Sequence, residues 1–278
     1  MVAGVQKNVS AFSIIGGAFK IFSKHPVLVV PLLPVFVAVL LLDVALIGAL
    51  MVDIPGIVLL AAFLVLLTAV AYVLMLSFSV SSAMLKQFDS GKPISLGEAM
   101  GEGLSKASLK LIPVTVVWVS TVVILVIIES MINRLTKGKG AAILDQITSG
   151  IATALRMMAF MMVSIFVFEG LGFMKAFGRM KEVLGNQAMN FISGVVLMRL
   201  VSFLVGVGLV LLVTVLGGLG VLLLPVYLAV AGVAWVASMY MEQMFVTAMY
   251  AYTMNPNGNL AKEFIEETLH YAPQPVAV

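Results

Sequence analysis

GIVLLAAFLVLLTAVAYVLMLSFSVSSAML, at residues 56–85, runs without a single charged side chain. A helix needs roughly 20 mostly apolar residues to cross the hydrocarbon core of a bilayer, so this stretch predicts a transmembrane helix. Five further stretches also qualify, at residues 26–52, 109–132, 150–169, 188–216 and 221–250. The sequence therefore predicts an all-α, polytopic membrane helix bundle with six transmembrane helices.

The composition supports this class. Of 278 residues, 62% are hydrophobic and 10% are charged, whereas soluble domains have about a quarter of their residues charged. The net charge is +3, but the basic residues lie between the apolar stretches and form no continuous stripe, which argues against a nucleic-acid partner. The chain has no cysteine, which excludes disulfides, thiolate metal sites and a cysteine nucleophile.

Turn-forming residues join the six stretches into three hairpins. Asp53-Ile54-Pro55 follows the first stretch and Gly217-Gly218-Leu219-Gly220 follows the fifth, while a polar loop at residues 133–149 follows the third. Lysine and arginine are enriched in cytoplasmic loops, so their distribution predicts orientation. Eleven of the sixteen flank one side of the predicted spans and three flank the other. This bias predicts a cell-membrane protein with both termini in the cytoplasm.

Each hairpin is preceded by a predicted cytoplasmic, interfacial amphipathic helix. These helices are expected at residues 12–24, 95–106 and 172–186, and each combines an apolar face with lysine, arginine or glutamate. Alignment of Ala18, Ala99 and Ala176 gives spacings of 81 and 77 residues. We interpret this as a threefold internal repeat with units at about 9–88, 94–169 and 170–254, followed by a cytoplasmic tail at 255–278. Seven basic side chains on these helices or just after them are predicted to face lipid headgroups: Lys20, Lys24, Lys106, Lys110, Lys175, Arg179 and Lys181.

Four charged residues inside the predicted spans are the candidate functional residues, because a charge in hydrocarbon is costly unless it is paired or hydrated. They are Asp43, Arg156, Arg199 and Glu242. Their depths allow two pairings, Arg199 with Glu242 and Asp43 with Arg156. The functional interpretation is a proton or ion path. We favour structural ion pairs, because no second acidic residue accompanies either arginine to form a relay.

The sequence contains no pattern that specifies a chemistry. Methionine is abundant, at 19 residues, and residues 156–162 (RMMAFMM) could in principle present thioethers to Cu(I). Methionine is more simply an apolar filler of helix packing, and neither histidine has a ligand-type neighbour at metal spacing. We also find no nucleophile triad and no pair of catalytic carboxylates. We therefore expect no enzyme, no metal site and no cofactor.

Three segments resemble a poorly characterised group of prokaryotic six-helix membrane proteins of unknown function. They are AFSIIGGAFKIFSKHP at 11–26, residues 78–84 leading into DSGKPISLGEAM at 89–100, and FVFEGLGFMKAF at 166–177. The repeated amphipathic helix that enters a hairpin also looks like the membrane domain fused to some glycerophosphodiester phosphodiesterases. The resemblance implies a fold and carries over no active site.

These observations lead to two functional hypotheses. The first is a non-catalytic scaffold or accessory subunit that interacts with membrane lipids and partner membrane proteins, or with further copies of itself. The alternative is a small transporter or channel with an intramembrane charged path. A continuous polar cavity lined by the four charged candidates would favour the transporter, whereas a tightly packed bundle would favour the scaffold.

Overall fold

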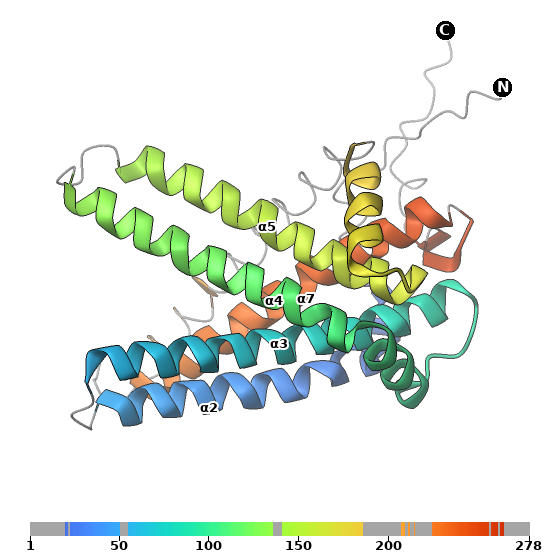
Figure 1. The fold of residues 1–278 in the computed structure, drawn as a ribbon. Coiled ribbons are helices and arrows are strands. Elements are labelled where there is room, and N and C mark those ends of the chain that lie inside the picture. The colour runs from blue at the N-terminus through green and yellow to red at the C-terminus, as the bar shows by residue number, and fades with distance from the viewer. Residues whose placement is uncertain are drawn as a thin grey trace, which may run out of the picture.

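The computed structural model describes residues 20–21, 23–50, 55–135, 141–185, 224–255, 257–260 and 262–263, and positions 207, 208, 211 and 214. Its labelled elements, in chain order, are η1 (Pro26–Leu32), α2 (Leu33–Leu50), α3 (Gly56–Asp89), α4 (Leu96–Leu135), α5 (Ala141–Glu169) and α7 (Leu224–Met254). A further helix, unlabelled in Figure 1, occupies residues 173–185. The described residues are helices and their connections, with no strand among them.

Five described segments are long and apolar enough to cross a membrane: Pro26–Ala49, Gly56–Asp89, Leu96–Ile132, Ile147–Glu169 and Ala229–Met254. They coincide with five of the predicted spans. The remaining prediction, at 188–216, lies outside the described residues except for four positions. The protein is thus a multi-pass helical membrane protein by length and composition, and the total of six spans in three hairpins stays a prediction.

The segment predicted as a separate helix at 95–106 is instead the start of α4. This helix has 40 residues, about 60 Å at about 1.5 Å per residue, which is twice the hydrocarbon thickness of a bilayer. Its first turns therefore extend beyond the hydrocarbon without a break in the helix. The predicted loop at 133–149 was also too long, because α5 already begins at Ala141. Of the helix predicted at 12–24, only Lys20, Ile21, Ser23 and Lys24 are described, and they are helical.

Glycines in the left-handed conformation end two of the long helices. Gly91 has φ 73° just after α3, and Gly170 has φ 68° just after α5. Only glycine adopts this conformation at little cost, so the chain leaves each helix sharply at these points. The turn at Gly170 separates α5 from the helix at 173–185, which agrees with the separate helix predicted at 172–186.

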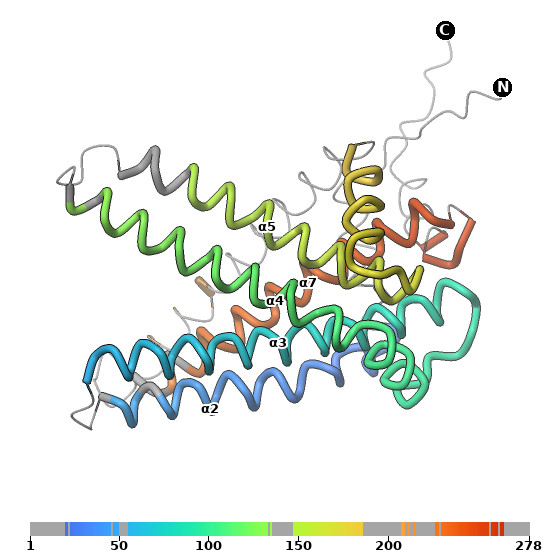
Figure 2. Tube along the Cα trace, viewed as in Figure 1, coloured from blue at the N-terminus to red at the C-terminus, as the bar shows by residue number. Residues whose placement is uncertain are grey.

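Helix α3 lies at the centre and contacts η1, α2, α4, α5 and α7. The buried side chains gather toward one end of the bundle, on residues 70–87 of α3, 157–167 of α5 and 236–251 of α7. In Figure 1 the pair α2 and α3 and the pair α4 and α5 diverge away from this end, and Figure 2 shows the described trace from the same side. Apolar side chains farther along are exposed, such as Ile57 at 80% and Val65 at 69%. Such surfaces suit lipid contact.

Helices α3 and α4 approach closely at Gly103. A Cβ atom added there would lie 2.8 Å from the Ser79 carbonyl oxygen and 3.0 Å from Val80 Cα. Both atoms belong to the backbone and cannot move aside. Small residues at such crossings let membrane helices pack by direct van der Waals contact.

We predict that Gly103→Ala destabilises the protein by about 1–3 kcal/mol, because it forces the two backbones apart. The matched control is Gly101→Ala in the same helix, where an added Cβ meets nothing within 4 Å. That control should be neutral or stabilising by up to about 1 kcal/mol through helix propensity. Thermal unfolding in detergent measures both, and equal effects would contradict the close approach.

Candidate functional site

An ion pair between α5 and α7 lies inside the bundle. Arg156 Nε is 2.9 Å from Glu242 Oε2, and the two side chains are only 14% and 2% exposed. Arg156 Nη1 also lies 3.2 Å from Met239 Sδ on α7. The opposite charges compensate each other where water is scarce, so neither is left isolated in the low-dielectric interior.

This pairing differs from both predicted pairings. Arg156 contacts Glu242 rather than Asp43, and Arg199 lies outside the described residues. Asp43 lies where α2 approaches α7, and a Cβ added at Gly232 would be 3.6 Å from Asp43 Oδ2. That oxygen is buried and accepts no hydrogen bond from the described residues. The depth of a residue along its predicted span could not identify the carboxylate that pairs with Arg156. Depth does not determine which helices are neighbours.

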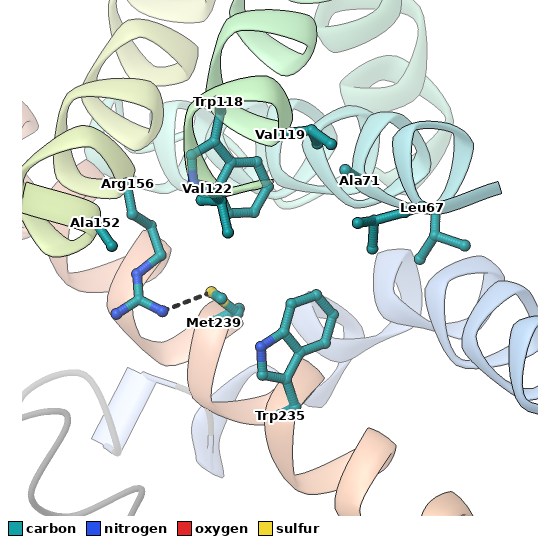
Figure 3. Close-up of a pocket in the computed structure, with 10 residues that line it drawn as sticks. Leu67, Ala71, Trp118, Val119, Val122, Ala152, Arg156, Trp235 and Met239 are labelled. Carbon is teal, nitrogen blue, oxygen red and sulfur yellow. Dashed lines mark hydrogen bonds between the residues drawn. The ribbon is translucent and has the colours of Figure 1, made fainter. Parts of the chain in front are cut away.

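A cavity of about 210 Å³ opens beside the ion pair, between α3, α4, α5 and α7 (Figure 3). Trp118 of α4 and Trp235 of α7 line it, and they are the two tryptophans of the chain. Arg156 is the one charged side chain among the lining residues, which are otherwise mainly aliphatic. The cavity therefore offers apolar contacts and few hydrogen bonds, a lining better suited to an apolar molecule than to a hydrated ion.

Uncharged polar side chains form a second buried group, closer to the packed end of the bundle. Gln243 Nε2 donates to Thr247 Oγ1 at 2.9 Å within α7. Thr247 Oγ1 in turn lies 2.9 Å from Ser164 Oγ of α5 and 3.1 Å from Ser82 Oγ of α3. The network joins three helices, and these hydroxyls find partners inside the protein without water. Gln243 Oε1 is the exception, since no described residue donates to it.

Lys86 connects three helices at the packed end. Its Nζ is 2.8 Å from Glu102 Oε1 of α4 and donates to the carbonyl oxygens of Val167 and Phe168 at 3.2 Å each. These carbonyls belong to the last turn of α5, where no helical N–H is available to them, and a cation suits the negative end of the helix dipole. Lys106 shares the same oxygen of Glu102.

Glu169 forms the second connection, at the end of α5. Arg179 Nε of the following helix lies 3.0 Å from Glu169 Oε1, and the Tyr250 hydroxyl of α7 donates to the same oxygen. Arg179 Nη1 is also 2.6 Å from Glu182 Oε2. Hydrogen bonds to Glu182 and then to Glu169 raise the pKa of Arg179, which stays fully charged. The helix at 173–185 is thereby fixed to both α5 and α7.

The segment after α7 is held against the start of the described chain. Glu263 Oε1 is 2.7 Å from Lys24 Nζ, and Glu263 Oε2 is 3.3 Å from Lys20 Nζ. Asp89, the last residue of α3, accepts hydrogen bonds from the Leu260 amide at 3.1 Å and from Asn255 Nδ2 at 3.3 Å. Lys24 is the main cause that lowers the pKa of Glu263. Residues 264–278 of the predicted cytoplasmic tail lie outside the described residues.

The basic residues predicted to face lipid fall into two groups. Lys20, Lys24, Lys106 and Arg179 are engaged in the ion pairs given above. Lys110, Lys175 and Lys181 form no ion pair with any described acidic residue. Whether any of them contacts lipid stays a prediction. Among the described residues, no three histidine, aspartate or glutamate side chains come together to hold a metal ion.

Sequence reasoning overlooked the uncharged polar residues inside the spans. Gln243 lies directly beside Glu242, and serines stand at positions 77, 79, 81 and 82 of α3, all of them buried. A search for amide and hydroxyl side chains within apolar stretches, and not only for charges, would have found both groups.

Comparisons of the chain with protein-family models, with curated proteins and with solved structures find no match. Functional inference therefore depends on the geometry of the chain itself.

We predict that Glu242→Gln destabilises the protein by about 3–5 kcal/mol, because it leaves the Arg156 charge buried without a counterion. The double variant Arg156→Met/Glu242→Gln removes both charges and should recover most of that loss. Glu98→Gln, at an exposed position of α4, is the control and should change stability little. Thermal unfolding in detergent of the wild type, the single variants Arg156→Met and Glu242→Gln and the double variant gives the coupling, and additive effects of the two single changes would argue against the pair.

We also predict that acid releases the segment after α7. A carboxyl with a lowered pKa contributes stability above its ordinary pKa, about 4.3, and loses it as the pH falls through the lower folded value. Hydrogen exchange of the Leu260 amide, relative to an unstructured chain at each pH, should therefore accelerate only in acid. Glu263→Gln should show that fast exchange already at neutral pH, and Lys262→Gln should not. Identical protection in wild type and Glu263→Gln would refute the contact.

Proposed function

We propose that this chain is a non-catalytic, multi-pass protein of the cell membrane that acts as a scaffold or accessory subunit. It would interact with membrane lipids and with partner membrane proteins or further copies of itself. The proposal includes six spans, arranged as a threefold repeat of hairpins, with both termini in the cytoplasm. The proposal also includes kinship with the uncharacterised prokaryotic six-helix membrane proteins named above, whose pattern is similar to the membrane domain of some glycerophosphodiester phosphodiesterases.

One observation carries the proposal: the interior polar groups mainly bind each other. Glu242 is 2% exposed and faces Arg156, and the Gln243–Thr247–Ser164 group is buried. A path for ions or polar solutes needs polar groups that face a hydrated space. Such groups replace the water molecules that an ion loses when it enters the path. Among the described residues Arg156 and Glu242 instead compensate each other inside the protein, which supports a structural role, and the buried Oδ2 of Asp43 is the exception.

The cavity beside Arg156 favours a second candidate, a small transporter. Of the three charged candidates that the structure describes, however, Arg156 alone lines the cavity, and its other walls are mostly apolar. This lining is a weak basis for a polar path. It would suit transport of an apolar molecule better than transport of an ion.

The absence of cysteine allows a direct test with single introduced thiols. A charged, membrane-impermeant thiosulfonate reacts with thiols that reach water, because the thiolate is the nucleophile. We predict that Ser164→Cys and Thr247→Cys in native membranes react from neither side. The chemically matched control, Ser90→Cys at an exposed position, should react from the cytoplasmic side alone. Gly56→Cys at the opposite end of α3 should react from the outside alone.

Labelling at position 164 or 247 would mean that water reaches the interior, and it would favour the transporter. Labelling of the variants at positions 90 and 56 from the same side would contradict a membrane-spanning α3, and labelling from the reversed sides would contradict the proposed orientation. A complementary measurement is purification in mild detergent with identification of the lipids and proteins retained. A stable complex supports the scaffold, whereas a lone protein whose melting temperature rises with one solute supports transport.

A further inference from the structure

A second, open apolar space lies between α4, α5 and the helix at 173–185, with a volume of about 130 Å³. We call it the lateral groove. Side chains from all three helices line it, including Val114, Trp118, Met158, Met162, Phe173 and Phe177. No charged residue is among its lining residues, so its walls suit a hydrocarbon chain.

The helix at 173–185 leaves an apolar edge uncovered beside this groove. Ala176 and Val183 on its buried face belong to the core of the bundle, and buried Met180 lies between this face and the groove that it also lines. Phe173 and Phe177 remain 38% and 39% exposed, although they also line the groove. The helix thus has one apolar side that is held by protein and another that is open at the groove.

Two lysines flank the groove without a described acidic partner. Lys110 lies one turn before Val114 on α4, where its Nζ donates to the Gly170 carbonyl oxygen at 3.0 Å and lies 5.7 Å from the Phe166 ring centre. Lys181 lies one turn after Phe177, with its Nζ 5.0 Å from that ring centre. Carbonyl and ring contacts orient these ammonium groups but leave their positive charge uncompensated.

We propose that the lateral groove binds an anionic phospholipid, with an acyl chain along Trp118 and Met162 and the phosphate near Lys110 and Lys181. The dimensions agree, because Lys110 and Trp118 are about 12 Å apart along α4 at about 1.5 Å per residue. That length matches the headgroup-proximal part of an acyl chain. Opposite charge at the mouth and an apolar wall below it are the two features that this ligand requires. The inference deepens the proposed lipid interaction and rests on it.

Tryptophan fluorescence tests this site directly. The Trp235→Phe variant leaves Trp118 as the single tryptophan, since the chain has two. The full chain is reconstituted in phosphatidylcholine that contains a small fraction of either brominated phosphatidylglycerol or brominated phosphatidylcholine. Bromine on the acyl chain quenches a tryptophan that it touches. We expect the anionic lipid to be roughly thirtyfold more effective at equal fraction, because two lysines near the phosphate contribute about 1 kcal/mol each and about 1.4 kcal/mol is tenfold.

Charge variants test whether Lys110 and Lys181 cause the preference for the anionic lipid. In the same background, Lys110→Gln/Lys181→Gln should reduce the ratio of the two quenchers to near one. The matched control is Lys92→Gln/Lys175→Gln, which removes two charges from lysines that also lack a described acidic partner. Lys175 is about 200° around the helix from Phe173, on the side away from the groove. This control should keep the preference, and Lys110→Arg/Lys181→Arg should keep it as well.

Three results would overturn the proposal. They are equal quenching by the two lipids in the parent, an unchanged preference in the Lys110→Gln/Lys181→Gln variant, or no quenching by either lipid because protein fills the groove. If the Lys110→Gln/Lys181→Gln variant fails to fold, the salt dependence of quenching in the Trp235→Phe parent still tests the proposal. A headgroup preference that added salt does not weaken would contradict binding by the two lysines. Labelling of the interior thiols tests the scaffold independently, so failure of one proposal is distinguishable from failure of the other.

Discussion

Everything in this structure depends on one constraint: hydrocarbon offers no hydrogen-bond partners, so polar groups inside the spans must be satisfied by the protein. The Arg156–Glu242 pair meets this constraint for charge, and the Thr247-centred group meets it for hydroxyls and an amide. Both join α7 to its neighbours. The choice of neighbouring helices therefore depends on the pairing of these polar residues.

At the packed end of the bundle, charged side chains supply the hydrogen-bond partners for the helix termini. Lys86 connects α3, α4 and α5, Glu169 connects α5, the helix at 173–185 and α7, and Asp89 holds the segment after α7. Each contact involves the last turns of a helix, where carbonyl groups and turns lack helical partners. The core lies at this end, whereas the far ends of α2, α3 and α4 expose apolar side chains to their surroundings. The described helices are thus linked by polar contacts at one end and expose apolar side chains along much of their length.

Hydropathy predicted the spans well because length and apolarity are local properties of the chain. Among the described basic residues, Lys86 and Lys106 share Glu102, whereas Arg179 pairs with Glu169 and Lys24 with Glu263. The partner of Arg156 was beyond such reasoning, because depth along the membrane leaves helix rotation and helix order undetermined. The extension of α4 back to Leu96 was missed for a related reason: an amphipathic segment looks the same whether it lies in the interface or continues a span. The role of Gln243 was missed because the search for candidates was restricted to charges.

The central claim is that Glu242 is a structural partner of Arg156 and is sealed from water. Infrared difference spectroscopy of the protein in lipid, recorded across the pH range in which it stays folded, tests this most directly. The Glu242→Gln variant identifies the bands that belong to this side chain. We expect a Glu242 carboxylate signal that does not change with pH. A protonated-carboxyl band that rises and falls with the pH of the medium and disappears in Glu242→Gln would contradict it, because it would show that protons from water reach the centre of the bundle.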